Sequence, residues 1–339
     1  MPSVNTSFDF SALAPFWIIL DQLSNDLEPS TKTWQSLLTL SGYRELIEHE
    51  FSEEFFIQHF SLAFRPSKRQ QLSEALLGSR KNYLRHYLQV ANERSKIEEQ
   101  IRWLAETPLA DAAAQLAREW LPTGIGDTPP TVHFVIFGPD ARGFSSVVVD
   151  AAFTLNLPDV AAALAHEFHH VYRRRLVAER IVSPPANVAD VVWALNQLHL
   201  EGLADQIDKR DWLDATPTSG PVAAYAKRYA EHFVNSPATI QALSDSLEEC
   251  AESPGRLQDV GKRIRAALPL AGHPTGAFMV RTIEEAFGRS ACIETVHDPF
   301  EFLRLYSAAA RQAQKAPPLT ATALRGVDSI ARFISTATA

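Results

Sequence analysis

The chain has 339 residues, of which 46% are hydrophobic and 21% are charged, and its net charge is −8. These proportions are typical of an ordinary globular protein, and the length fits either one large domain or two lobes that share an interface. The negative charge disfavours a nucleic-acid partner, because binding to phosphates needs clustered Lys and Arg. No apolar run is long enough to cross a bilayer, so we expect no membrane contact.

The N-terminal segment and the cysteines bear on the compartment. One short apolar patch runs from Phe16 to Leu20, with Asp9 and no basic residue ahead of it. A signal peptide has the opposite charge order and a longer apolar stretch, so we expect a cytoplasmic protein. Cys250 and Cys292 are too few for a disulfide framework, and without a Cys-x-x-Cys pair they exclude a thiolate zinc knuckle. We expect both to be small buried residues.

Helical patterns dominate residues 9 to about 120. Within this part, apolar residues seven apart predict one long amphipathic helix over residues 67–106. The following segment, "LPTGIGDTPPT" at 121–131, concentrates Pro and Gly, which break helices. We therefore predict an N-terminal helical lobe at 1–128 and a second part at 129–339, although the two could form one continuous domain.

Two β-branched and aromatic runs follow, at 132–137 and 145–155, joined by "GPDARG". They predict two strands and a turn in a small sheet, in which His133 is an ordinary strand residue. From Pro158 onward the pattern is helical again. The predicted fold class is therefore α+β and predominantly helical, with a small β-sheet between helical lobes.

The segment 158–175 contains the sequence "HEFHH" and predicts a helix. Pro158 and Asp159 suit its first turn, and the three arginines at 173–175 suit its last turn, because each group complements the helix dipole. This placement explains the arginine run without a nucleic-acid partner. His166 and His170 are four residues apart, so their side chains stack on neighbouring turns of one face.

His166, Glu167 and His170 form an HExxH pattern, in which two His bind zinc and the Glu handles a proton of the zinc-bound water. The chemistry is specific, because two neutral nitrogens leave zinc electrophilic and a carboxylate one position round the helix reaches the water. His169 could compete as a ligand, but we expect it to be a polar residue near the cleft or the surface.

A second helical segment, around 190–209, offers a third ligand. Glu201 can bind a metal, Gly202 lets two helix backbones come close, and Asp205 one turn later can hold the far nitrogen of a ligating His. We expect His199, which points away from Glu201, to be structural or exposed.

These residues resemble the gluzincin metallopeptidases, the thermolysin-like class, in which a Glu with an Asp four residues later follows HExxH. The strings "HEFHH", "EGLAD", "GHPTGAFMVRTIEEAFG" and "DPFEFLRLY" are also similar to bacterial families known only by the description of zinc-dependent proteases. Only the two metal motifs are specific. Leu200 stands where thermolysin-like enzymes have Asn, and the spacing between the motifs is longer.

The resemblance implies a gluzincin-like catalytic core with one zinc ion per chain. His166, His170 and Glu201 would be the ligands and Glu167 the general base, while Asp205 would hold a ligating His. Such enzymes place a Tyr or His across the zinc to stabilise the oxyanion, and His273 is our candidate, with a solvent-exposed loop residue as the alternative. Tyr306 is the second candidate, with packing as its alternative.

The resemblance also implies a substrate strand and a reaction. The strand at 145–153 would be an edge strand that pairs with a peptide or protein substrate, or else a plain core strand. The predicted reaction is peptide-bond hydrolysis. Two alternatives stay open, namely a zinc hydrolase for a non-peptide amide or ester, and a non-catalytic helical interaction protein with a structural metal site. The oligomeric state is left open.

Overall fold

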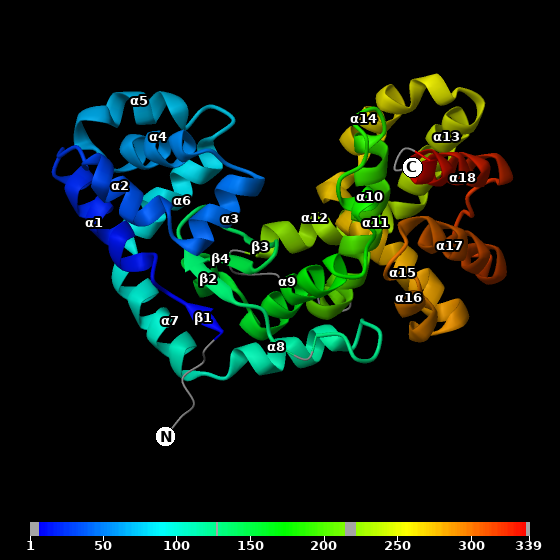
Figure 1. Ribbon diagram of the computed structural model, residues 1–339, viewed down its shortest axis with the longest axis horizontal. Coiled ribbons are helices and arrows are strands. Elements are labelled where there is room, and N and C mark those ends of the chain that lie inside the picture. Colours follow the sequence, from blue (N-terminus) through cyan, green and yellow to red (C-terminus); the bar gives the residue numbers. More distant parts are fainter. Residues whose placement is uncertain (1–6, 127, 214–221, 337–339) are drawn as a thin grey trace. The chain divides into compact units, whose positions relative to one another are not determined.

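The computed structural model of the protein describes residues 7–126, 128–213 and 222–336. The chain divides into two compact units. Unit 1 comprises residues 1–114 and 128–171, and unit 2 comprises residues 115–127 and 172–339. The fold class is predominantly helical α+β, as predicted, with the strands in unit 1 (Figure 1). The predicted boundary at residue 128 stays a prediction.

Unit 1 contains a four-stranded sheet in the order β1-β2-β4-β3. Strands β1, β2 and β4 are parallel, and β3 pairs with β4 in the antiparallel sense. Every residue of β2 and β4 is buried, which explains their run of Val and Phe. The strands are β1 (Phe8–Asp9), β2 (Val132–Val135), β3 (Ala141–Gly143) and β4 (Val147–Asp150).

The sheet differs in two ways from the two strands and a turn that the sequence predicted. The segment "GPDARG" is not a simple turn, because it contains β3, and β2 and β4 are therefore parallel neighbours. The second predicted strand ends early, at Asp150, and residues 153–156 form the 3-10 turn η2 (Phe153–Asn156). The buried Asp150 carboxylate explains this end, because it accepts hydrogen bonds from the backbone N–H groups of Phe137, Gly138 and Phe153 and contacts His86 Nε2 at 2.9 Å.

Helices gather beside this sheet in the first part of the chain (Figure 1). Their core is aromatic, with Phe16, Phe56, Phe60 and Tyr87 fully buried and in ring contact. The helices are α1 (Leu13–Ser24), α2 (Thr31–Leu38), α3 (Ser41–His49), α4 (Glu53–Phe64), α5 (Arg69–Ala75), α6 (Lys81–Asn92) and α7 (Arg94–Glu106), with the 3-10 turn η1 (Pro66–Lys68).

The single long helix predicted over 67–106 is wrong, because η1, α5, α6 and α7 occupy this segment. The first break lies at Gly78 and Ser79, two residues of lower helix propensity than their neighbours. The second lies at Glu93, whose φ of −110° and ψ of 14° are non-helical. The seven-residue period survives the second break, because Val90 before it and Ile97 and Leu104 after it are all buried.

Unit 2 contains helices and turns, and no strand, among the residues that the structure describes. It contains α10 (Glu179–Val182), α11 (Ala189–Asp208), α12 (Ala223–Val234), α13 (Ser236–Glu252), α14 (Leu257–Ala267), α15 (His273–Phe287), α16 (Arg289–Glu294), α17 (Pro299–Ala313) and α18 (Ala321–Thr336), with the 3-10 turns η3 (Arg210–Trp212), η4 (Pro254–Arg256) and η5 (Pro269–Gly272). Two further helices, α8 (Leu109–Arg118) and α9 (Val160–Arg174), each continue from one unit into the other.

Helices α11 and α15 meet through their backbones. A Cβ atom added to Gly276 would lie 2.0 Å from the carbonyl oxygen of Leu198, and one added to Gly202 would lie 2.5 Å from the carbonyl carbon of Gly276. Any side chain at either position would separate the helices. The close approach predicted for Gly202 is therefore confirmed.

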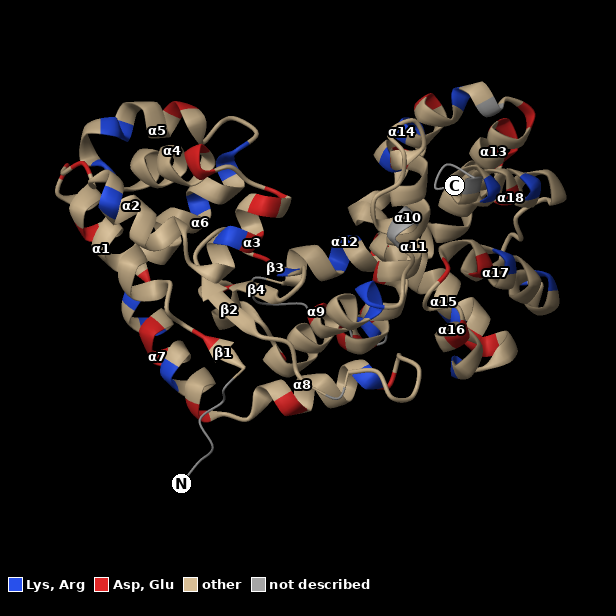
Figure 2. Cartoon of the chain, in the orientation of Figure 1, with Lys and Arg blue, Asp and Glu red and all other residues tan. Residues whose placement is uncertain are grey.

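Basic and acidic residues are both spread along the helices of each unit (Figure 2). Within the described ranges, no helix combines the length and the apolar character needed to cross a membrane.

Candidate metal centre

Helix α9 carries the HExxH residues. It begins two residues later than predicted, at Val160, and the Asp159 carboxylate caps it by accepting a hydrogen bond from the N–H of Ala162 at 3.0 Å. Leu164, Phe168 and Val171 are buried and fix the helix by its apolar face. The predicted helix at 158–175 is thus observed at 160–174.

His166, Glu167 and His170 lie together on α9, with ligand atoms within 4.8 Å of one another. The two imidazole rings are 4.5 Å apart between centroids and nearly perpendicular, at 83°. Both His are buried, whereas Glu167 is only half-buried. Two imidazole nitrogens and a carboxylate form a donor set that suits zinc. His169, expected near the cleft or the surface, is instead fully buried.

Strand β3 lies against this part of α9. A Cβ atom added to Gly143 would be 2.8 Å from the carbonyl oxygen of Glu167 and 2.9 Å from the Cβ of His170. The absence of a side chain at Gly143 therefore allows the strand to lie beside the HExxH residues. The strand at 145–153 is not an edge strand, because β4 lies between β2 and β3; the core alternative is correct.

Strand β3 forms one edge of the sheet, and β1 forms the other. The N–H of Phe144 donates to Ser146 O at 2.8 Å, and the N–H of Asp150 donates to Asp140 O at 3.1 Å. Hydrogen-bonded pairs alternate along an antiparallel ladder, so residues 140, 142 and 144 face β4. The backbone groups of Ala141 and Gly143 then face away from β4, and those of Ala141 bond to the Asp140 carboxylate at 2.9 Å and to Arg142 Nη1 at 2.9 Å.

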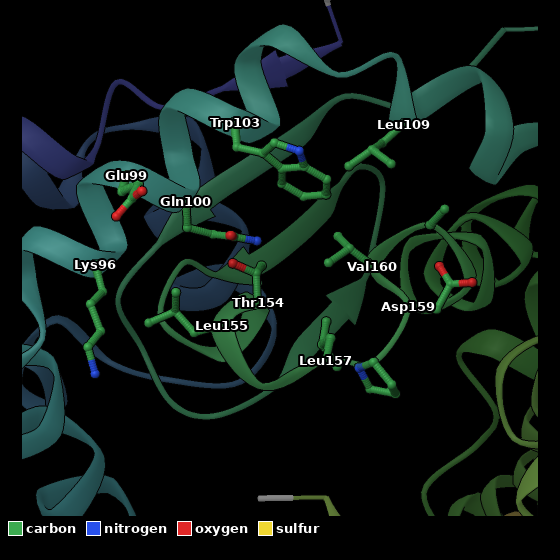
Figure 3. A pocket seen from close by; sticks show the side chains of 12 residues that line it. Lys96, Glu99, Gln100, Trp103, Leu109, Thr154, Leu155, Leu157, Asp159 and Val160 are labelled. Atoms are coloured by element: carbon green, nitrogen blue, oxygen red, sulfur yellow. The ribbon is translucent and has the colours of Figure 1, made fainter. Parts of the chain in front are cut away.

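Unit 1 also contains a cavity of about 710 Å³, at the N-terminal end of α9 (Figure 3). Trp103 and Gln100 of α7, Leu155 of the η2 segment and Val160 of α9 are among the side chains that line it. None of the HExxH residues lines this cavity, so the metal cluster and the cavity are separate features of unit 1.

Helix α11 carries Glu201 and Asp205 on neighbouring turns, and both are buried. The predicted helix at 190–209 is observed at 189–208. His273 is the first residue of α15, and its Nδ1 lies 2.9 Å from Asp205 Oδ1 and 3.3 Å from Glu201 Oε2. Its side chain is 20% exposed, so the alternative of a solvent-exposed loop residue is wrong.

Two residues that the sequence did not single out also bind Asp205. The Tyr229 hydroxyl donates to Asp205 Oδ2 at 2.9 Å, and Lys209 Nζ donates to Oδ1 at 2.9 Å. Burial lowers the pKa of Lys209, but Asp205 and Asp208 outweigh it and hold this pKa well above its usual range. Burial likewise lowers the pKa of His273, but Asp205 and Glu201 outweigh burial and raise this pKa above its usual value. Asp205 is therefore a buried carboxylate with partners from α12, from α15 and from the residue that follows α11.

The other candidates have structural roles. His133 Nδ1 contacts Asp9 at 2.8 Å within the sheet, and His199 is buried and stacked on Phe302, so both are structural as expected. Tyr306 donates to Pro317 O at 2.9 Å, which fits the packing alternative. Cys250 and Cys292 are free and buried, as expected.

The fold and the clusters on α9 and α11 define a helical α+β protein with candidate metal ligands. A family model with the description "Putative zinc dependent peptidase (DUF5700)" matches residues 34–315, and the chain belongs to this family. No curated protein and no solved structure matches the chain. The family description agrees with the donor set and suggests zinc as the metal.

Proposed function

We propose that the protein is a gluzincin-type zinc metallopeptidase in which His166, His170 and Glu201 hold one zinc ion per chain. The observation that carries the proposal is the His166–Glu167–His170 cluster on α9, with ligand atoms within 4.8 Å of one another. The family description supports zinc. When bound, zinc would polarise the peptide carbonyl and lower the pKa of water.

Glu167 is the general base in this proposal. It is half-buried on α9 between the two His, so its carboxylate is open to water and close to the ligand atoms. It would accept a proton from the attacking water and pass it to the nitrogen of the leaving amine.

The substrate would bind as an extended strand along β3. Gly143 turns its backbone groups away from β4 and lies against Glu167 and His170, whereas the backbone groups of Ala141 already bond to the side chains of Asp140 and Arg142. A peptide paired with this edge would have its main chain beside the general base. The substrate strand is thus proposed for 141–143 instead of 145–153.

His273 would stabilise the negative charge that develops on the carbonyl oxygen. Asp205 was expected to hold a ligating His. The contact that supports a positioning role for Asp205 is the one with His273, whose Nδ1 lies 2.9 Å from Asp205 Oδ1. We propose that Asp205 fixes the orientation of His273 and favours its charged form. Tyr229 and Lys209 in turn fix Asp205.

The proposed setting is the cytoplasm and the proposed partner is a peptide or protein substrate. Neither nucleic acid nor a membrane is a partner in this proposal, because the chain is acidic and its charges are mixed in sign.

Metal content tests the first part of the proposal. Protein purified without added zinc should contain one zinc per chain by elemental analysis. Chelation should lower the thermal midpoint, because the metal binds the folded state preferentially. A metal-free protein that also takes up no zinc would refute the proposal.

A peptide library tests the chemistry. Wild type should cleave some members of a mixed library, with the products sequenced by mass spectrometry. Glu167→Gln should keep its zinc and lose hydrolysis by about 10²- to 10⁴-fold. Glu54→Gln, at an exposed position of α4, is the matched control and should cleave as wild type does. A zinc-loaded protein that hydrolyses amide or ester substrates but no peptide would indicate the non-peptide hydrolase.

A further inference from the structure

Arg173 differs from the two arginines that follow it. All three were expected to complement the dipole at the end of α9, and Arg174 and Arg175 are exposed. Arg173 is only 2% exposed. It stands three residues after His170 in the same helix, so its burial concerns the helix that carries the proposed ligands.

The Arg173 guanidinium binds α11. Its Nη2 donates to Asn196 Oδ1 at 3.0 Å and to His199 Nδ1 at 2.9 Å. These contacts lie within unit 2. Since α11 also carries Glu201, two residues after His199, Arg173 connects the end of the HExxH helix to the helix of the third proposed ligand.

Neither partner of Arg173 is a carboxylate. Asn196 is an amide, and His199 accepts the Arg173 hydrogen bond at Nδ1, while its Nε2 lies 3.2 Å from Thr295 Oγ1. Stacking on Phe302 fixes the ring.

Arg173 thus carries a buried charge without a direct ion pair, because no carboxylate in the described ranges lies within salt-bridge distance of it. Burial lowers its pKa to about 9, and the more distant carboxylates of Glu201 and Asp298 offset part of this shift. A buried charge that is not directly paired destabilises a fold, and an apolar side chain of similar volume is often neutral or stabilising. Stability alone does not account for an arginine here.

We propose that Arg173 is a positioning residue for the metal centre. Its two hydrogen bonds fix the end of α9 on α11, so that His166 and His170 on one helix and Glu201 on the other are directed to the same ion. Its charge also attracts the Glu201 carboxylate. This inference rests on the proposed function, because it assumes that these three residues share one zinc.

Zinc affinity and stability separate this role from a structural one. We expect Arg173→Met to bind zinc about 10- to 100-fold more weakly in a competition titration. This is the usual size of the effect when a residue supports the ligands without binding the metal itself. The zinc-free variant should unfold at or above the wild-type midpoint. The visible absorption of the cobalt-substituted protein should change, because it reports the geometry of the ligands. Arg174→Met, at the exposed neighbour, is the matched control and should change neither.

Asn196→Ala provides a second test in case Arg173→Met does not fold. This variant keeps the arginine and removes one acceptor at a half-buried site, and we expect up to about tenfold weaker zinc binding with an altered cobalt spectrum. If both folded variants kept wild-type zinc affinity and cobalt spectra, the positioning role would be overturned. If Arg173→Met did not fold, wild-type values for Asn196→Ala alone would overturn it. Wild type that binds no zinc would instead refute the proposed function.

Discussion

In unit 1 the candidate residues belong to one helix, α9, with strand β3 beside it, whereas in unit 2 they come from α11, α12 and α15 and meet at Asp205. The first group has two imidazoles, one half-buried carboxylate and the backbone of Gly143. The second group is buried and densely charged, with Asp205 and Lys209 in direct contact.

Because the two groups differ in this way, we expect substitutions in them to have different effects. Around α9, substitutions of Glu167 or Gly143, neither of them a proposed ligand, should alter chemistry or substrate binding with little effect on buried charge. Substitutions around Asp205 should alter metal affinity and stability together, because removal of one buried charge leaves another without its partner. The predictions below test this distinction in order of decreasing effect.

Glu201→Ala should have the largest effect on metal affinity. If Glu201 is a direct ligand, zinc binding should weaken by more than about 100-fold, beyond the range of residues that only support a ligand. Competition titration against a chromogenic chelator measures this. Glu231→Ala, at an exposed position of α12, should leave zinc affinity unchanged. Wild-type affinity in Glu201→Ala would move the third ligand elsewhere, first to Asp205.

Asp205→Ala should combine two losses. Zinc affinity should fall by about 10- to 100-fold. The zinc-free protein should be destabilised by about 3–5 kcal/mol, because buried Lys209 loses one of its carboxylates. Chemical denaturation in the presence of a chelator measures the second loss. Asp211→Ala, exposed in η3, should show neither. Weaker zinc binding without lower stability would remove the proposed difference between the two regions.

Gly143→Ala should test the contact between strand β3 and helix α9 in unit 1. The added methyl group would meet the carbonyl oxygen of Glu167 at 2.8 Å and should destabilise the protein by about 1–3 kcal/mol while zinc stays bound. Peptide hydrolysis should fall because β3 moves away from α9. Gly255→Ala is the control, since its methyl group would meet no atom within 4 Å. Unchanged stability and hydrolysis would contradict the substrate role of β3.

Tyr229→Phe should have the smallest effect. Asp205 would keep its bonds to Lys209 and His273, so we expect a loss of about 1 kcal/mol in stability and a change in zinc affinity of less than about tenfold. Thermal unfolding and the zinc titration measure these. Tyr225→Phe, one turn earlier on α12, should be neutral because its hydroxyl makes no hydrogen bond among the described residues. A loss as large as that of Asp205→Ala would mean that Tyr229 is essential to this cluster.

The same contrast explains what the sequence could predict. The α9 cluster could be predicted from the sequence because a four-residue spacing on a helix fixes which side chains are neighbours. Lys209 could have been found in the same way, since it lies four residues after Asp205. Tyr229 and His273 lie 24 and 68 residues from Asp205, and tertiary packing brings them there. No local pattern encodes such contacts.

Strand β3 was missed for a different reason. It has only three residues, and its sequence "ARG" has no β-branched or aromatic side chain. Pairing with β4 holds it in place. The prediction of one helix over 67–106 was wrong because a seven-residue period can continue across a turn when the helices on both sides of the turn bury residues in the same core.

The contact between Gly202 and Gly276 has a consequence for thermal motion. Side chains in a helix interface can change rotamer as temperature rises, but an interface of backbone atoms has no rotamers to exchange. Asp205 and His273 each lie three residues from one of these glycines, within about one helical turn. Their separation should therefore change little between low and high temperature, even where nearby side chains become mobile.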